Sequence, residues 1–175
     1  ADEVADDCLT DQTGTLTFNA ADSTELAANV GSAGALLLGG AGIPTGPLVL
    51  DLDASIGSNN ITEFSGADLG THRLTIYGAG VIGGVTGSGG ITKEWPGELD
   101  LDGTNTYTGA TVVDDGELNV NGAVTVSSFV LGGGVLSGGG SVGSISGTSG
   151  GVAPDEGGTL SAGSTALSSG VTFYS

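Results

Sequence analysis

The residues best suited to hold a ligand are two pairs of aspartates. Asp51 and Asp53 follow an apolar run, and Asp100 and Asp102 repeat the same Asp-Leu-Asp pattern 49 residues further along. Carboxylates spaced by two along a strand lie on one face of it, and Ca²⁺ prefers such oxygen ligands. The four aspartates therefore form either a solvated acidic face or a calcium site. We expect no cofactor, with calcium as the one alternative.

Groups suited to catalysis are sparse. The chain has one histidine, His72, and its neighbours Thr71 and Arg73 indicate a loop residue, not a member of a Ser-His-Asp triad. Residues 87–90, GSGG, precede an apolar strand and no helix, which excludes a phosphate loop at a helix terminus. Paired carboxylates also hydrolyse polysaccharides, but no motif fixes a pair in a cleft. We therefore predict that the protein is not an enzyme, with a polysaccharide-active enzyme as an alternative.

The charge of the chain is strongly one-sided. Twenty acidic residues stand against two permanent cations, Arg73 and Lys93, and the net charge is −18. Binding to nucleic acid or to an anionic membrane needs cations, so this composition argues against both. The longest apolar run, residues 34–39, is too short to cross a bilayer, and we expect no membrane insertion by this segment. The acidic surface favours solubility, divalent cations or a basic partner.

Strict alternation of apolar and polar residues identifies strands. Residues 98–102, ELDLD, and 117–120, ELNV, place leucine and valine on one face and polar side chains on the other. Glycine accounts for 36 of the 175 residues, and methionine is absent, so the core consists of small aliphatic side chains. Such a core suits a narrow solenoid. The repeated Asp-Leu-Asp pattern indicates coils of about 20–25 residues.

This region also carries a family resemblance. Residues 91–93 (ITK), 97–101 (GELDL), 103–112 (GTNTYTGATV) and 116–118 (GEL) resemble the autotransporter-associated β-strand repeat in order and spacing. The departures are Trp95-Pro96 in place of a small residue, Glu98 in place of threonine, and Asp155 after Pro154 in a later repeat. The resemblance implies an all-β, right-handed parallel β-solenoid (β-helix), exported to the cell surface or beyond. The family has no shared catalytic site.

The two ends of the chain differ from the region between them. Residues 1–13 are acidic and are expected to form a leader or cap, and residues 14–175 to form one solenoid domain. Cys8 is the only cysteine, so it is either an unpaired thiol or an intermolecular link. Val171, Phe173 and Tyr174 belong to an alternating strand that ends abruptly. An open strand edge invites pairing, so we predict that these residues and Cys8 form assembly contacts.

Two functions agree with these features. The first is a non-enzymatic structural or adhesive segment of passenger type, an adhesin, whose partner is a host or other extracellular surface. The second is a secreted filament subunit whose open ends join head to tail by self-assembly. Trp95 and Tyr107 form a sugar-stacking surface in one interpretation, and in the other Trp95 only covers a corner. Asn105 is expected to shape a turn through side-chain hydrogen bonds.

Overall fold

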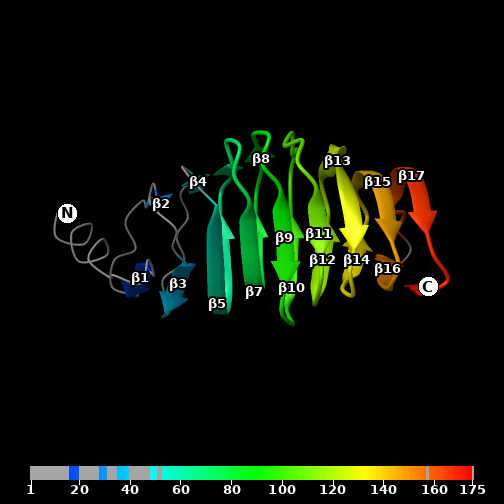
Figure 1. Cartoon of the computed structure of the whole chain (residues 1–175), viewed down its shortest axis with the longest axis horizontal. Coiled ribbons are helices and arrows are strands. Elements are labelled where there is room, and N and C mark those ends of the chain that lie inside the picture. Colours follow the sequence, from blue (N-terminus) through cyan, green and yellow to red (C-terminus); the bar gives the residue numbers. More distant parts are fainter. Residues whose placement is uncertain are drawn as a thin grey trace.

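The computed structural model describes residues 16–19, 28–30, 35–39, 48–50, 53–156 and 158–174. Every regular element within these residues is a β-strand, and every paired strand runs parallel to its neighbours. The strands stack in chain order along the long axis of the molecule, from β3 to β17 (Figure 1). The prediction of an all-β parallel β-solenoid is confirmed.

Each coil of the solenoid passes through three faces, and strands from successive coils stack on each face. The first face holds β1 (Leu16–Asn19), β3 (Ala35–Gly39), the N-terminal parts of β5 (Ala54–Phe64) and β7 (Leu74–Ile82), β9 (Ile91–Glu94), β11 (Thr111–Val113), and the C-terminal parts of β13 (Ala123–Leu131), β15 (Ser141–Gly147) and β17 (Ser161–Leu167).

The second face continues from the first after a bend or a short turn. It holds the C-terminal parts of β5 and β7, then β10 (Glu98–Leu101), β12 (Glu117–Val120), β14 (Val135–Gly138), β16 (Gly150–Pro154) and β18 (Val171–Phe173). The third face holds β2 (Ala28–Val30), β4 (Leu48–Leu50), β6 (Ala67–Asp68), β8 (Val85–Thr86), and the N-terminal parts of β13, β15 and β17. A corner is named below by the two faces that it joins.

The length of a coil varies along the stack. Residues paired in register on neighbouring coils are 16 to 21 positions apart in the chain. The expected range of about 20–25 residues per coil is therefore too long. Within each face the strands keep their register, and the difference is absorbed by the turns at the corners and by register shifts inside the β5–β7 and β13–β15 pairs. Gly132, Gly133 and Gly134 occupy one first–second corner where the preceding coil has Asp114, Asp115 and Gly116.

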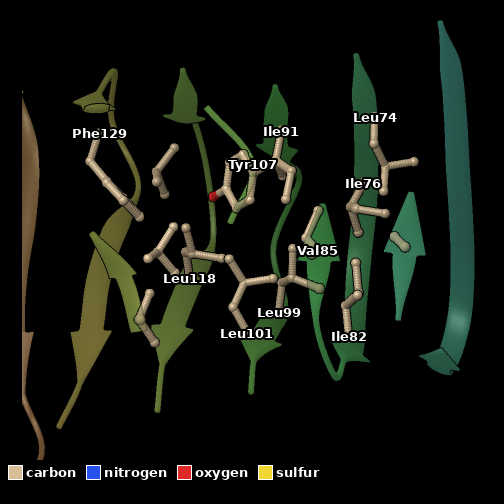
Figure 2. Close-up of a cluster of buried hydrophobic side chains, with 14 of the residues drawn as sticks. Leu74, Ile76, Ile82, Val85, Ile91, Leu99, Leu101, Tyr107, Leu118 and Phe129 are labelled. Carbon is tan, nitrogen blue, oxygen red and sulfur yellow. The ribbon is translucent and has the colours of Figure 1, made fainter. Parts of the chain in front are cut away.

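The core is a stack of aliphatic side chains that point inward from all three faces. In β10 and β12 the buried residues are Leu99, Leu101, Leu118 and Val120, and the residues between them lie on the outer side. The alternation read from the sequence is therefore confirmed for these two strands. Their register pairs Leu99 with Leu118, so like residues stack on like. Figure 2 shows this stack continuing across several coils.

A row of hydrogen-bonded polar side chains lies within the core. Tyr107 is fully buried, and its hydroxyl hydrogen-bonds the Thr111 hydroxyl. The Oγ1 of Thr111 in turn lies 2.8 Å from the Oγ of Ser127, which donates to the carbonyl oxygen of Gly109 at 2.8 Å. The hydroxyl groups of Tyr107, Thr111 and Ser127 thus all have hydrogen-bond partners, as buried polar groups require. Burial raises the pKa of Tyr107 to about 12, although the hydrogen bonds to Thr111 and Ser127 act in the opposite direction.

Asn105 shapes the turn that precedes Tyr107, as the sequence predicted. It is 3% exposed, and its Oδ1 accepts a hydrogen bond from the backbone N–H of Val85 at 2.8 Å. Its Nδ2 donates to the carbonyl oxygen of Asp102 at 3.2 Å. The side chain therefore supplies an acceptor to the adjacent coil where residues 105–108 lie outside any strand.

The buried phenol predicts a loss of stability at alkaline pH. An unfolded tyrosine ionises near pH 10, whereas Tyr107 stays protonated to about pH 12. The unfolded state therefore binds fewer protons in this range, and the free energy of unfolding falls as the pH rises, by as much as ~2.7 kcal/mol in total. Urea unfolding of the protein and of Tyr107→Phe from pH 9 to 12 measures this. In Tyr107→Phe this fall in the free energy of unfolding should be absent. An equal pH dependence of the two proteins would contradict a raised pKa of Tyr107 as its cause.

Candidate functional site

The aspartates of the predicted calcium site that the structure describes do not share one place in the fold. Asp51 lies outside the described residues, and Asp53 lies at the third–first corner, just before β5. The Oδ1 of Asp53 accepts the backbone N–H of Arg73 at 2.8 Å and lies 3.8 Å from Nδ1 of His72. Asp100 lies on β10 of the second face, and Asp102 directly follows that strand. The last residues of the two Asp-Leu-Asp patterns, Asp53 and Asp102, therefore lie at different corners, and their inferred equivalence is wrong.

The structure offers no further support for the calcium site. Among the described residues there is no group of three or more histidine, cysteine, aspartate or glutamate side chains placed to hold a metal ion. Calcium binding by Asp51, Asp53, Asp100 and Asp102 stays a prediction, because Asp51 is outside that part of the chain.

Asp100 lies in an acidic stripe on the outer side of the second face. Partial burial raises its pKa, and repulsion from Glu98, Asp102 and Glu117 adds to the shift, whereas a hydrogen bond from Asn119 opposes it. Asn119 also donates to the carboxylate of Glu98, at 2.9 Å, and so bridges two carboxylates. At neutral pH the charged form of Asp100 is therefore less stable in the fold than in the unfolded chain.

Asp100→Asn is accordingly expected to stabilise the protein at pH 7. A raised pKa means that the contribution of Asp100 to stability is present at low pH and is lost as the pH rises through that pKa. Because the group is largely solvated, the gain is a few tenths to about 1 kcal/mol and shrinks in high salt. Urea unfolding at pH 7 and at pH 3 measures this. The gain of the variant over the parent should be larger at pH 7 than at pH 3. An equal or smaller gain at pH 7 would contradict the expectation.

Both permanent cations donate hydrogen bonds to neighbouring parts of the fold. Lys93 is fully buried, and its Nζ donates to the carbonyl oxygens of Glu94 at 3.1 Å and Trp95 at 2.6 Å. Burial lowers the pKa of Lys93, and the Asp115 carboxylate opposes that shift. Arg73 is partly buried and donates to Thr92 Oγ1 at 2.9 Å. The chain has only these two permanent cations, so Lys93 is withdrawn from the surface and Arg73 stays partly exposed.

His72 does not complete a catalytic triad in the described part of the chain. It lies in the turn before β7, where its backbone N–H donates to the carbonyl oxygen of Leu69 at 2.8 Å. Its ring faces Asp53 at 3.8 Å, and no hydroxyl group among the described residues hydrogen-bonds that ring. The absence of enzymatic activity stays a prediction.

Trp95 is a large apolar side chain exposed on the described surface. It is 62% exposed and lies with Pro96 in the first–second corner between β9 and β10. Its ring packs against Tyr77 of the previous coil, with the centroids 5.1 Å apart and the planes tilted by 59°. Tyr107, which the sequence suggested as its partner in a sugar-stacking surface, is inside the core. That interpretation of the Trp95–Tyr107 pair is therefore wrong, and Tyr77 is the residue that was missed.

The assembly residues proposed from the sequence lie partly on the last described coil. Val171 and Phe173 belong to β18, which pairs with β16, and β17 pairs with β15. Phe173 and Tyr174 are 66% and 53% exposed. The backbone N–H of Tyr174 donates to the carbonyl oxygen of Val152 at 2.9 Å, which anchors the segment to the coil before it. Cys8 lies outside the described residues.

Comparison with known proteins gives one informative similarity. The chain is 45% identical over 59 residues to an extracellular serine protease of Serratia marcescens. The matched stretch is 34% of this chain and 6% of that protein, so the chain spans a small part of its relative. No family model matches the chain, and no solved structure matches it either. None of the described residues forms a helix that is long and apolar enough to cross a membrane.

Proposed function

We propose that this chain is a segment of the passenger region of an autotransporter-type surface protein, with a structural or adhesive role and no enzymatic activity. The supporting observation is the uninterrupted parallel ladder through β5, β7, β9 and their successors on the first face. Its similarity to part of an extracellular protein agrees with a location outside the cell. The resemblance of residues 91–118 to autotransporter-associated repeats adds support of a different kind.

The proposed structural role depends on the repetition of one unit, the coil of the solenoid. Backbone hydrogen bonds between coils and the stacked aliphatic core make the solenoid stiff, because each coil is held by the coils on both sides. Its outer surface carries many carboxylates and, of the two permanent cations, only the partly exposed Arg73, which keeps such a rod soluble and discourages lateral association. A rod of this kind extends a binding surface away from its attachment point without moving parts.

End-to-end assembly is a second candidate function. It is favoured by Phe173 and Tyr174, which are exposed on the last described coil, formed by β17 and β18. In this case the exposed strands would pair with the first coil of another copy, in a contact that does not close on itself. Sedimentation velocity of the chain and of a Phe173→Ser, Tyr174→Ser variant distinguishes the cases. Monomers at all concentrations for both proteins would exclude assembly through this surface.

The main proposal is tested on intact cells that make the full protein. Antibodies against this chain should label intact cells, and binding should not increase after permeabilisation. Beads coated with the purified chain should adhere to a host or matrix surface, and a fluorophosphonate probe should leave the chain unlabelled. Labelling only after permeabilisation would contradict the location, and covalent reaction with the probe would contradict the absence of a serine-hydrolase site.

A further inference from the structure

Trp95 is held in a backbone conformation that its residue type disfavours. Its φ is +65°, and it is the only described residue other than glycine with a positive φ. At the corresponding corner of the next coil the positive φ falls on Gly116, which has no Cβ to oppose it. Because the indole is mostly exposed, burial of the side chain does not offset the strain. Strained residues of this kind cluster where a protein binds a ligand.

Lys93 holds this corner from the inside. Its ammonium group donates to the carbonyl oxygens of Glu94 and Trp95, which belong to the peptide units on the two sides of Trp95. The side chain is fully buried and makes no ion pair within the described residues. A buried ammonium is costly, so this arrangement is unusual for a position that only stabilises the core. It fixes the segment that carries the exposed indole.

The surroundings of the indole are aromatic on one side and acidic on the other. Tyr77, on the preceding coil, contacts Trp95 and lies in register with Glu94. On the following coil the backbone N–H of Asp114 donates to the carbonyl oxygen of Lys93, which places Asp114 at the same corner. Glu98 and Glu117 begin β10 and β12 and lie opposite each other. Five carboxylates therefore lie at or next to this corner: Glu94, Glu98, Asp114, Asp115 and Glu117.

We propose that the Trp95–Tyr77 corner binds an organic cation, namely the guanidinium or ammonium group of a basic peptide. An aromatic face attracts such cations, Trp most strongly, and the neighbouring carboxylates supply acceptors and negative potential. The net charge of −18 draws a basic partner to this surface. A second copy of the chain is a poor occupant, because Lys93 is buried and Arg73, the other permanent cation, already donates to Thr92. The site does not depend on the proposed surface location.

Trp95 is the only tryptophan, so its fluorescence reports directly on this corner. The titrants are a short peptide with two arginines, the same peptide with lysines, and the same peptide with neutral citrullines. The arginine and lysine peptides should change the emission with a saturable isotherm, and the citrulline peptide should not. Tyr77→Ala keeps the reporter and should weaken binding about three- to tenfold.

Charge-matched variants separate this site from general attraction to an acidic protein. Glu94→Gln and Glu156→Gln each remove one exposed or partly exposed carboxylate, but Glu156 lies at a different corner. Glu94→Gln should weaken binding severalfold and Glu156→Gln should leave it unchanged. Trp95→Gly, measured by calorimetry, should abolish saturable binding without lowering the urea midpoint, because glycine relieves the strained φ.

Several results would overturn the proposal. Equal losses in Glu94→Gln and Glu156→Gln would reduce the binding to nonspecific charge attraction. Saturable binding of a neutral disaccharide such as cellobiose, with none of the basic peptides, would make the corner a sugar site. A marked drop in the urea midpoint of Trp95→Gly would give Trp95 a structural role instead.

Discussion

Replacing Gly122 with alanine is expected to destabilise the solenoid by roughly 2–4 kcal/mol. Gly122 lies at a second–third corner directly over Gly103 of the preceding coil. A Cβ at position 122 would lie 1.8 Å from the carbonyl oxygen of Gly103, and that oxygen already accepts the N–H of Ala123 at 2.9 Å. The carbonyl oxygen belongs to the backbone and the Cβ is fixed directly to it, so the clash is removed only if the two coils move apart. The glycine is therefore a consequence of how closely the coils approach.

Urea unfolding followed by circular dichroism measures the loss. The matched control is Gly84→Ala at a second–third corner nearer the N-terminus, where the added Cβ would lie 3.4 Å from the carbonyl oxygen of Thr104, an ordinary contact. Gly84→Ala should change the free energy of unfolding by less than about 1 kcal/mol. Equal effects of the two substitutions would show that the coils are spaced differently at Gly122.

Lys93→Ala is expected to cost about 3–5 kcal/mol, whereas Lys93→Met should cost no more than about 1–2 kcal/mol. Lys93 points inward, in register with Ile76 and Val113, so its stem fills core volume. Alanine leaves a cavity and also removes the donor to the carbonyl oxygens of Glu94 and Trp95. Methionine removes the same donor but keeps most of the volume, and it also removes the cost of burying a charge.

The two variants are compared by urea unfolding at pH 7, with Trp95 fluorescence as a second readout. Lys93→Met should keep the cooperative transition but change the emission of Trp95, because the carbonyl oxygens of its corner lose their donor. Similar stability of Lys93→Ala and Lys93→Met would show that the lysine stem does not fill the core at this position.

Strand positions were predictable where the alternation is strict. In residues 98–101 and 117–120 only one of the two possible strand orientations places leucine and valine in the core, and the structure has that orientation. The turn formed by Asn105 was also predictable, because its side chain mimics a backbone partner. These features depend on local chemistry, which is present in the sequence.

The burial of Lys93 and Tyr107 was missed, although a signal was present. Lys93 is in phase with the buried Ile91, and Tyr107 is in phase with the buried Asn105. Residue type suggested exposure for both, and their partners lie on different coils or across a turn. Ser127, which completes the hydrogen bonds around Tyr107, is 20 positions further along. Tertiary contacts decided these two positions.

The repeated Asp-Leu-Asp pattern misled for a related reason. Equal residues 49 positions apart imply equal places only if every coil has the same length, and here the register offset varies from 16 to 21. Asp53 therefore lies at the third–first corner, and Asp102 at the second–third corner. Likewise, the pairing of Trp95 with Tyr77 depends on an offset of 17 between their coils that the sequence does not display.

The stacking of coils is the central claim, because both the rod and the Trp95 corner depend on it. Thr75, Thr92, Val112, Val130 and Ser146 occupy one outward column of the first face, each in register with the next. Thr75 and Ser146 are therefore four coils apart, about 19 Å at the usual spacing between strands.

Double electron–electron resonance between spin labels at these two positions measures the separation directly. The labels are attached in a Cys8→Ser, Thr75→Cys, Ser146→Cys variant, since Cys8 is the only native cysteine. A single narrow distribution near ~19 Å, broadened only by the label linkers, is the predicted result. A broad distribution, or a mean well above 30 Å, would contradict the stacked parallel solenoid.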